Sequence, residues 1–285
     1  MVTVLDDEYV LQMDDIPPFS WLAKSHERIM NCSIRSEDKI IIHAKGNAFT
    51  YSLISKNISG RNMEVDEFYE NTEEGLHIII STGGDEENSI NFLKSFGGKC
   101  MVVSGGGQIK KIARGKGYEF ISLPKGMPSR FMFPEIMGCI SGLTDVEDKN
   151  DLSQDISKLS PASLSEENIA KSIAIKMMNK RPVIVYGERG YGFARKFFED
   201  LLQNSGIISS IMSINQIDMI DDIGDGSVVI EVAKSKKQRF KNSLFMEIRE
   251  DLSGAIYLLT LMSYISLYLS LLNERDFFLF DRMKE

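Results

Sequence analysis

The chain has 285 residues, of which 43% are hydrophobic and 26% are charged, so it has the composition of a folded globular protein with room for two α/β domains. The net charge of −8 argues against a nucleic-acid partner, because phosphate backbones are bound by clustered Lys and Arg. Three widely spaced cysteines and three histidines form neither a disulfide framework nor a metal-binding motif. We therefore expect reduced thiols, no metal, no cofactor, no signal peptide and a cytoplasmic location.

Four apolar, β-branched runs in the first half of the chain have the length of strands, and segments with a helical pattern separate them. Continuous apolar strands that alternate with helices are typical of a parallel sheet covered on both faces. The expected strands are Lys39–Ala44, His77–Ser81, Lys99–Ser104 and Tyr118–Leu123, and the expected helices are Ala48–Asn57, Asp85–Phe96 and Gln108–Arg114.

The polar segment Asp145–Glu167 is expected to be a linker, because it is rich in Ser and Asp and contains Pro161. The alternation of helices and strands resumes after it. Expected there are a helix at Asn168–Lys180, a strand at Pro182–Gly187, a helix at Gly190–Asn204, strands at Ile207–Ile214 and Ser227–Ala233, and helices up to the C-terminus. The sequence thus predicts an α/β fold with two doubly wound parallel-sheet subdomains, at residues 1–150 and 151–285, the second with C-terminal helices.

Residues Ala255–Leu272 form an uncharged stretch of 18 residues, which is long enough for a membrane helix. The stretch also carries four Ser or Thr residues and three Tyr residues. A helix that is apolar on all sides can equally lie in the core of a large domain or in a subunit interface. We expect a buried helix that contributes to a dimer contact, and no membrane partner.

Two glycine-rich turns, Thr82-Gly-Gly-Asp and Ser104-Gly-Gly-Gly, each follow a predicted strand and precede a predicted helix. Backbone N–H groups at helix N-termini hold anions, and ligands of open parallel sheets sit at the carboxyl ends of the strands. The pair therefore favours a site for an anion such as a sugar phosphate. For the first turn alone, an ordinary strand-to-helix connection with an Asp cap explains the sequence equally well. Neither turn matches a nucleotide-binding motif.

The segments STGGDEEN, SGGGQI and LPKGMPSRFMFP resemble the SIS (sugar isomerase) fold, and in particular the bifunctional phosphoglucose/phosphomannose isomerase family. The segment SYISLYLSLLNERDFFLFDRMK resembles the last helices of that family. The resemblance extends from Ile40 to Lys284 and is weak between Gly206 and Asp251. It implies two flavodoxin-like SIS subdomains and a homodimer whose subunits share the active site.

The resemblance further implies that the chain interconverts glucose-6-phosphate or mannose-6-phosphate with fructose-6-phosphate through an enediolate. In such an enzyme a carboxylate base moves a proton between neighbouring carbons, an Arg stabilises the oxyanion, and a Lys and a His assist ring opening. Arg130 matches this Arg, Lys284 matches the Lys of the last helix, and Asp218 stands at the position of the Glu base. The implied substrate-binding residues are Gly46, Asn47, Ser81, Thr82, Gly83, Gly84, Ser104, Gly105 and Gly106.

Several positions depart from the family pattern. The first loop, Gly46–Ala48, lacks a hydroxyl, Asp218 is one methylene shorter than Glu, and no histidine follows His77. His43, at the end of the first expected strand, is either a partly buried strand-end residue or a residue that approaches the site. Asp85 replaces a Thr, and an ionised carboxylate about 4 Å from a phosphate would repel it by roughly 4 kcal/mol at an effective dielectric near 20. Asp85 must therefore point away or exclude a phosphate. The alternative hypothesis is a catalytically degenerate protein that binds a sugar or sugar phosphate as a sensor or regulator.

Overall fold

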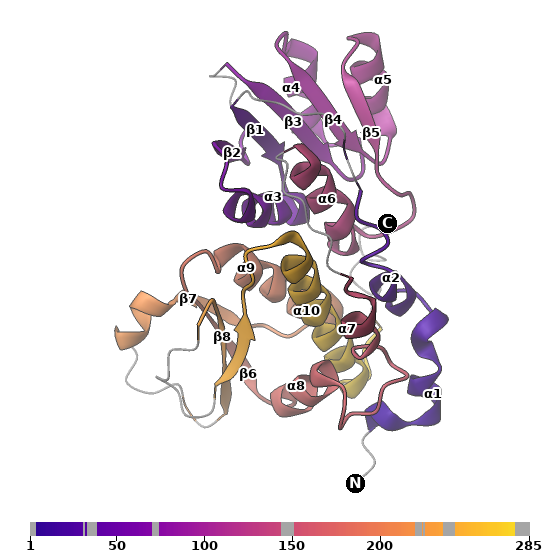
Figure 1. The fold of residues 1–285 in the computed structure, drawn as a ribbon, viewed down its shortest axis with the longest axis vertical. Coiled ribbons are helices and arrows are strands. Elements are labelled where there is room, and N and C mark those ends of the chain that lie inside the picture. The colour runs from indigo at the N-terminus through magenta and orange to yellow at the C-terminus, as the bar shows by residue number, and fades with distance from the viewer. Residues whose placement is uncertain are drawn as a thin grey trace. The chain divides into compact units, whose positions relative to one another are not determined.

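The computed structural model describes residues 4–30, 32, 39–69, 74–143, 151–219 (backbone only for 217–219), 224, 226–235 and 243–276. They form two compact units, which we describe separately (Figure 1). Unit 2 is the continuous segment Arg28–Asp148, and unit 1 combines Met1–Glu27 with Lys149–Glu285. The first 27 residues therefore group with the C-terminal half of the chain.

Buried polar contacts explain why the N-terminal residues belong to unit 1. The Nζ atom of the fully buried Lys171 donates to the backbone oxygen of Leu5 at 2.6 Å. The hydroxyls of Ser25 and Thr260 are hydrogen-bonded at 3.1 Å. A buried ammonium group needs such partners. The N-terminal residues therefore supply hydrogen-bond partners to buried polar groups of unit 1.

Unit 2 contains a five-stranded parallel sheet in the order β2-β1-β3-β4-β5. This is the flavodoxin-like order, in which the chain reverses its winding direction between β1 and β3. The strands are β1 (Ile40–Ala44), β2 (Met63–Asp66), β3 (Leu76–Ser81), β4 (Cys100–Ser104) and β5 (Glu119–Ser122).

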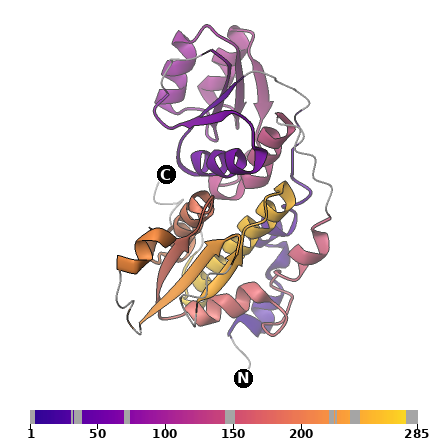
Figure 2. The same ribbon diagram turned by 60° about the vertical axis from the view of Figure 1, so that its left-hand side comes forward.

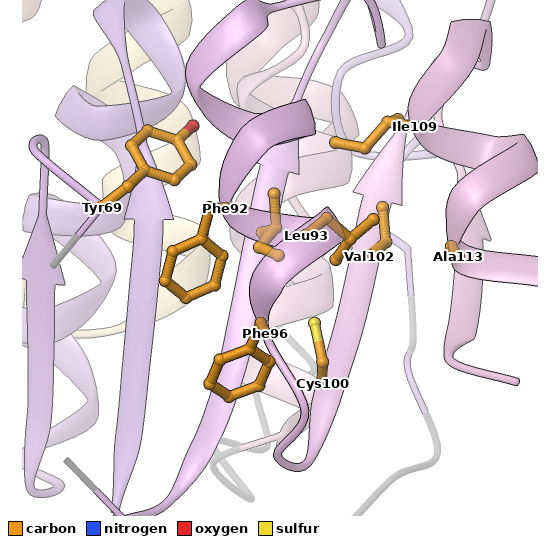
Figure 3. Close-up of a cluster of buried hydrophobic side chains, with 9 residues drawn as sticks. Tyr69, Phe92, Leu93, Phe96, Cys100, Val102, Ile109 and Ala113 are labelled. Atoms are coloured by element: carbon orange, nitrogen blue, oxygen red, sulfur yellow. The ribbon is translucent and has the colours of Figure 1, made fainter. Parts of the chain in front are cut away.

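Helices cover both faces of this sheet. Because crossovers between parallel strands are right-handed, the reversal places α3 on the face opposite to α4 and α5, and α6 packs beside α3. Figure 3 shows the apolar cluster between the sheet and α4 and α5, which includes Phe92, Val102 and Ile109. The helices are α3 (Gly46–Ser59), α4 (Glu87–Ser95), α5 (Gly107–Gly115) and α6 (Phe133–Leu143).

Unit 1 contains a four-stranded parallel sheet in the order β7-β6-β8-β9. Its strands are β6 (Arg181–Tyr186), β7 (Ser210–Ser213), β8 (Ser227–Ala233) and β9 (Leu244–Glu247). Its helices are α1 (Glu8–Leu11), α2 (Phe19–Ala23), α7 (Ser153–Ser157), α8 (Ile169–Met177), α9 (Tyr191–Asp200) and α10 (Leu252–Leu272), with a π-helical turn at Leu201–Ser205 and short 3-10 turns at Val4–Asp6, Met13–Asp15 and Ile214–Met219. The helix α7 lies inside the segment that was expected to be a linker.

The long apolar helix α10 is the core of unit 1, as expected for a buried helix. It runs beside α8 and α9 (Figures 1 and 2), and 83% of its most apolar window is buried. Several of its hydroxyls have partners inside the same unit: Ser263 donates to Asp200 and Tyr268 donates to the oxygen of Leu159. By length and composition alone α10 could cross a membrane. Its burial within one chain also leaves it little surface for the dimer contact that we had assigned to it.

The expected fold class is confirmed, since both sheets are parallel and helices lie between most of their consecutive strands. The strands β2 and β9 and the helices α1, α2, α6 and α7 were not predicted from the sequence. The strands β2 and β9 are four residues long and lie at sheet edges, where most of their side chains are only partly buried, so neither forms a continuous apolar run. The helix α6 is buried on all sides and so lacks the polar stripe that marks a surface helix.

Candidate functional site

The two glycine-rich turns meet at the carboxyl edge of the sheet in unit 2, because β3 and β4 are neighbours in parallel register. The N–H group of Gly105 donates to the oxygen of Thr82 at 3.2 Å, and the N–H group of Ile109 donates to the oxygen of Gly84 at 3.0 Å. The structure therefore brings together the loop residues that the sequence analysis selected after β3 and β4. We call this region of unit 2 the carboxyl-edge site.

The close packing of the two turns explains two of their glycines. Gly84 has a φ of +80°, and a Cβ atom there would lie 2.1 Å from the oxygen of Gly106. Gly107 has a φ of +64°, and its Cβ would lie 2.4 Å from the oxygen of Gly84. No side chain fits at either position. Gly83 differs, because its φ is not in the left-handed region and a Cβ atom there would meet nothing within 4 Å; Gly46 also has open space, but its φ of +55° favours glycine.

Asp85 caps a helix, but not the helix that it precedes. Its Oδ1 atom accepts a hydrogen bond from the N–H group of Gln108 at 2.8 Å, in the first turn of α5. A carboxylate at a helix N-terminus is stabilised by the unpaired N–H groups and by the helix dipole. The carboxylate of Asp85 therefore lies at the N-terminus of α5, where a bound anion would otherwise lie.

The hydroxyls of the two turns fall into two classes. Ser81 and Ser104 are buried and hold their own turns: Ser81 Oγ accepts from the N–H group of Gly84 at 3.2 Å, and Ser104 Oγ accepts from that of Gly106 at 3.3 Å. Thr82 is half-buried, and within the part of the chain that the structure describes its hydroxyl has no partner. It remains available to a ligand.

The loop after β1 adds a second helix N-terminus to the carboxyl-edge site. Lys45 precedes α3 and provides no side-chain cap, and the first turn of α3 contains no acidic residue. Asn47 donates through Nδ2 to the hydroxyl of Ser129 at 3.1 Å, whereas its buried Oδ1 atom has no hydrogen-bond partner among the described residues. The N-terminus of α3 therefore has neither a side-chain cap nor an acidic residue in its first turn, unlike that of α5, which Asp85 caps.

The loop after β5 crosses this edge of the sheet. A Cβ atom at Gly106 would lie 3.9 Å from Cε of Lys125, so this exposed lysine lies beside the second glycine-rich turn. Four residues later, Ser129 contacts Asn47 at the start of α3. The same loop therefore connects the second turn with the first helix of the site. The sequence analysis did not select Lys125, although a Lys next to a Gly in a Pro-containing loop is a usable signal.

Arg130 lies in the 3-10 turn Ser129–Phe131 and is 1% exposed. Its Cζ atom lies 4.9 Å from the centroid of the Phe131 ring, and its backbone oxygen accepts from the hydroxyl of Tyr51 at 2.8 Å. The guanidinium group is therefore held inside the protein and does not face bulk solvent. Its neighbour Ser129 links it to the start of α3.

A second cation missed by the sequence analysis stands at the switch point of the sheet. The Nζ atom of Lys45 lies 3.8 Å from Oε1 of Glu86 and 6.0 Å from the centroid of the Tyr69 ring. Glu86 also accepts from the hydroxyl of Ser89 at 2.9 Å, in the first turn of α4. The N-terminus of α4 is therefore acidic, and Lys45 balances part of this charge on the side of α3.

Of the two interpretations of His43, the structure supports the buried strand-end residue. His43 is fully buried, and its Nδ1 lies 3.0 Å from Asp66 Oδ2 while its Nε2 lies 2.8 Å from Nδ1 of His77. Burial lowers the pKa of His43 to about 4, although Asp66 acts in the opposite direction. A neutral histidine inside the core cannot assist the opening of a sugar ring.

Two of the proposed catalytic residues cannot be placed. Asp218 lies in the 3-10 turn Ile214–Met219, of which only the backbone is described at this position. Lys284 lies outside the described residues. Within the described ranges, no group of three or more His, Cys, Asp or Glu residues is arranged to hold a metal ion.

Comparisons with known proteins agree with this architecture. No protein-family model matches the chain. Over 244 residues the chain is 24% identical to the bifunctional phosphoglucose/phosphomannose isomerase of Caldicellulosiruptor bescii, which covers 70% of this chain and 72% of the relative.

Two solved structures have the same fold. A glucose-6-phosphate isomerase like protein from Thermus thermophilus matches with a TM-score of 0.68 and 16% identity over 95% of this chain and 94% of its own. Tagatose-6-phosphate ketose/aldose isomerase from Escherichia coli matches with a TM-score of 0.57 and 12% identity over 96% and 95%. The comparisons confirm the resemblance found in the sequence, and the fold is the SIS fold.

Proposed function

We propose that the carboxyl-edge site binds a phosphosugar and that the protein is an aldose–ketose isomerase of the phosphoglucose/phosphomannose type. The observation that supports this most directly is the gathering of free donors at one edge of the sheet. The hydroxyl of Thr82, the uncapped N-terminus of α3 and the ammonium group of Lys125 all belong to loops that contact one another.

The phosphate group is proposed to bind at the N-terminus of α3 rather than at that of α5. Asp85 already satisfies α5 and would repel a phosphate about 4 Å away by roughly 4 kcal/mol at an effective dielectric near 20. The first turn of α3 carries no acid and follows Lys45. Helix N-termini of this kind favour phosphate through their free N–H groups and dipole.

The chemical step is proposed as proton transfer between neighbouring carbons through an enediolate. In this proposal Asp218 is the base, Arg130 stabilises the oxyanion, and Lys284 assists ring opening in a site that two subunits of a homodimer share. Burial of Arg130 supports its role, since a charge in a water-poor site acts more strongly on a developing oxyanion.

A coupled assay tests the proposal by following conversion of fructose-6-phosphate to glucose- or mannose-6-phosphate. Thr82→Val removes the free hydroxyl but keeps the shape of the side chain. Arg130→Lys keeps the positive charge but removes the planar guanidinium group and its paired N–H donors. We expect each substitution to lower kcat/KM on the order of 10- to 100-fold, which corresponds to the free energy of one hydrogen bond to a charged group. Lys111→Ala, on the exposed face of α5, is the matched control. Equal activity in all variants would contradict the proposal.

A second candidate function is binding of a sugar or sugar phosphate without turnover. The position of Asp85 favours it, because a carboxylate has taken the anion-binding end of α5. This candidate predicts no turnover of fructose-6-phosphate together with an increase in Tm when a phosphosugar is added. Turnover that Arg130→Lys lowers would exclude it.

A further inference from the structure

A short segment of unit 2, which we call the strap (Arg28–Met30 and Cys32), lies against helix α6. Two glycines of α6 allow the close approach. A Cβ atom at Gly138 would lie 2.7 Å from the backbone nitrogen of Met30, and one at Gly142 would lie 2.5 Å from the backbone oxygen of Cys32. Any side chain at these glycines would displace the strap.

An ion pair holds the other end of the strap on the same helix. The Nε atom of Arg28 lies 3.0 Å from Oε1 of Glu135, and both side chains are largely buried. The strap is therefore fixed on α6 by charge at one end and by close backbone packing at the other.

This packing brings two thiols together that are 107 residues apart in the sequence. The sulfur atoms of Cys32 and Cys139 lie 2.6 Å apart, about 0.5 Å more than the ~2.05 Å of a disulfide bond. Both residues are free cysteines. The sequence analysis had treated the three cysteines as separate reduced thiols, because nothing in their spacing shows this contact.

The two thiols differ in their ionisation. The contact with the Cys139 thiol lowers the pKa of Cys32, although burial opposes the shift. The same contact and burial raise the pKa of Cys139. Cys32 is also the more accessible, with 9% exposure against 1% for Cys139. The nucleophile of the pair is therefore Cys32, since the thiolate is the reactive form.

We propose that Cys32 and Cys139 form a redox-active dithiol that a peroxide converts into an intramolecular disulfide. The thiolate of Cys32 attacks one oxygen of hydrogen peroxide, the O–O bond breaks, and the hydroxide that leaves takes up the thiol proton as water. Cys139 then attacks the sulfenic sulfur of Cys32, the S–O bond breaks, and a second water leaves with the proton of Cys139. Two thiols lose two electrons in total, and the peroxide gains them.

The disulfide would bind the strap covalently to α6. That helix begins at Phe133, three residues after Arg130, so oxidation fixes the element that follows the candidate oxyanion residue. The inference does not depend on the proposed isomerase function, because the thiols and their contact belong to the fold.

The third cysteine provides an internal control. Cys100 lies in the apolar cluster against α4 and α5 (Figure 3), and burial raises its pKa to about 12. It is 8% exposed, close to the 9% of Cys32, so a difference in reactivity between the two reports ionisation and the neighbouring thiol rather than accessibility.

The experiment treats the full-length reduced protein with hydrogen peroxide and counts thiols after denaturation. We expect the count to fall from three to one per chain with a mass loss of about 2 Da, and peptide mapping should join the peptides that contain Cys32 and Cys139. Cys100→Ser should form the same disulfide at an unchanged rate. In Cys139→Ser, a dimedone adduct should appear on Cys32. Loss of Cys100 at the rate of Cys32, disulfide-linked dimers as the main product, or three intact thiols would each overturn the proposal.

Discussion

The buried pair His43 and His77 makes a specific prediction about stability and pH. His43 is 0% exposed, and burial lowers its pKa from 6.5 to about 4. Burial also lowers the pKa of His77. In both cases the unfolded chain binds protons more tightly than the folded chain, so the free energy of unfolding falls as the pH falls.

The size of the effect follows from the shift at His43. A difference of about 2.5 pKa units, at 1.36 kcal/mol per unit, corresponds to about 3 kcal/mol of unfolding free energy. This stability is fully present above the unfolded pKa near 6.5 and is lost progressively down to about pH 4. The lowered pKa of His77 acts in the same direction.

The assay is urea unfolding of wild type and His43→Gln at several pH values, followed by circular dichroism. Gln keeps polar atoms opposite Asp66 but does not titrate, so we expect a lower stability at pH 7 and a pH dependence about 3 kcal/mol smaller. His26→Gln is the control, because His26 lies in unit 1 outside the buried pair. Trp21, the single tryptophan, also belongs to unit 1, and its fluorescence follows that unit separately. Equal pH slopes in wild type and His43→Gln would refute the reasoning.

Two further predictions concern the glycine-rich turns. Gly84→Ala should lower the free energy of unfolding by about 3 kcal/mol or more, because the position combines a φ of +80° with a Cβ contact of 2.1 Å. Gly83→Ala is the control and should change it by less than about 0.5 kcal/mol; thermal unfolding compares the two. Asp85→Asn should cost about 0.3–1 kcal/mol through the loss of charge at the N-terminus of α5. The same substitution should tighten phosphosugar binding in calorimetry, and an unchanged or weaker affinity would show that Asp85 does not limit the site.

Sequence reasoning succeeded for features that a local residue pattern or the order of the strands determines. The central strands were visible because they are continuous apolar runs, and the two turns were placed together because parallel neighbours end at one edge. The same reasoning gave Asp85 two possible roles without choosing between them. It failed to find the partner of Asp85, since Gln108 is 23 residues away on another helix.

Contacts between distant segments account for the other features that the sequence analysis missed. His43 looked like a strand-end residue, and only the lateral register of β1, β2 and β3 places Asp66 and His77 beside it. The contact between Cys32 and Cys139 likewise depends on how the strap crosses α6, which no local pattern encodes.

The chain order of the two units has a consequence for synthesis on the ribosome. Unit 2 is an uninterrupted segment, Arg28–Asp148, inserted between the two parts of unit 1. Its sheet and helices can therefore form while the polypeptide is still emerging, because domains tend to fold as units in N-terminal order. The first 27 residues are synthesised before unit 2, yet helix α10, on which they dock, is synthesised after it. These residues therefore stay undocked at least until α10 has been made.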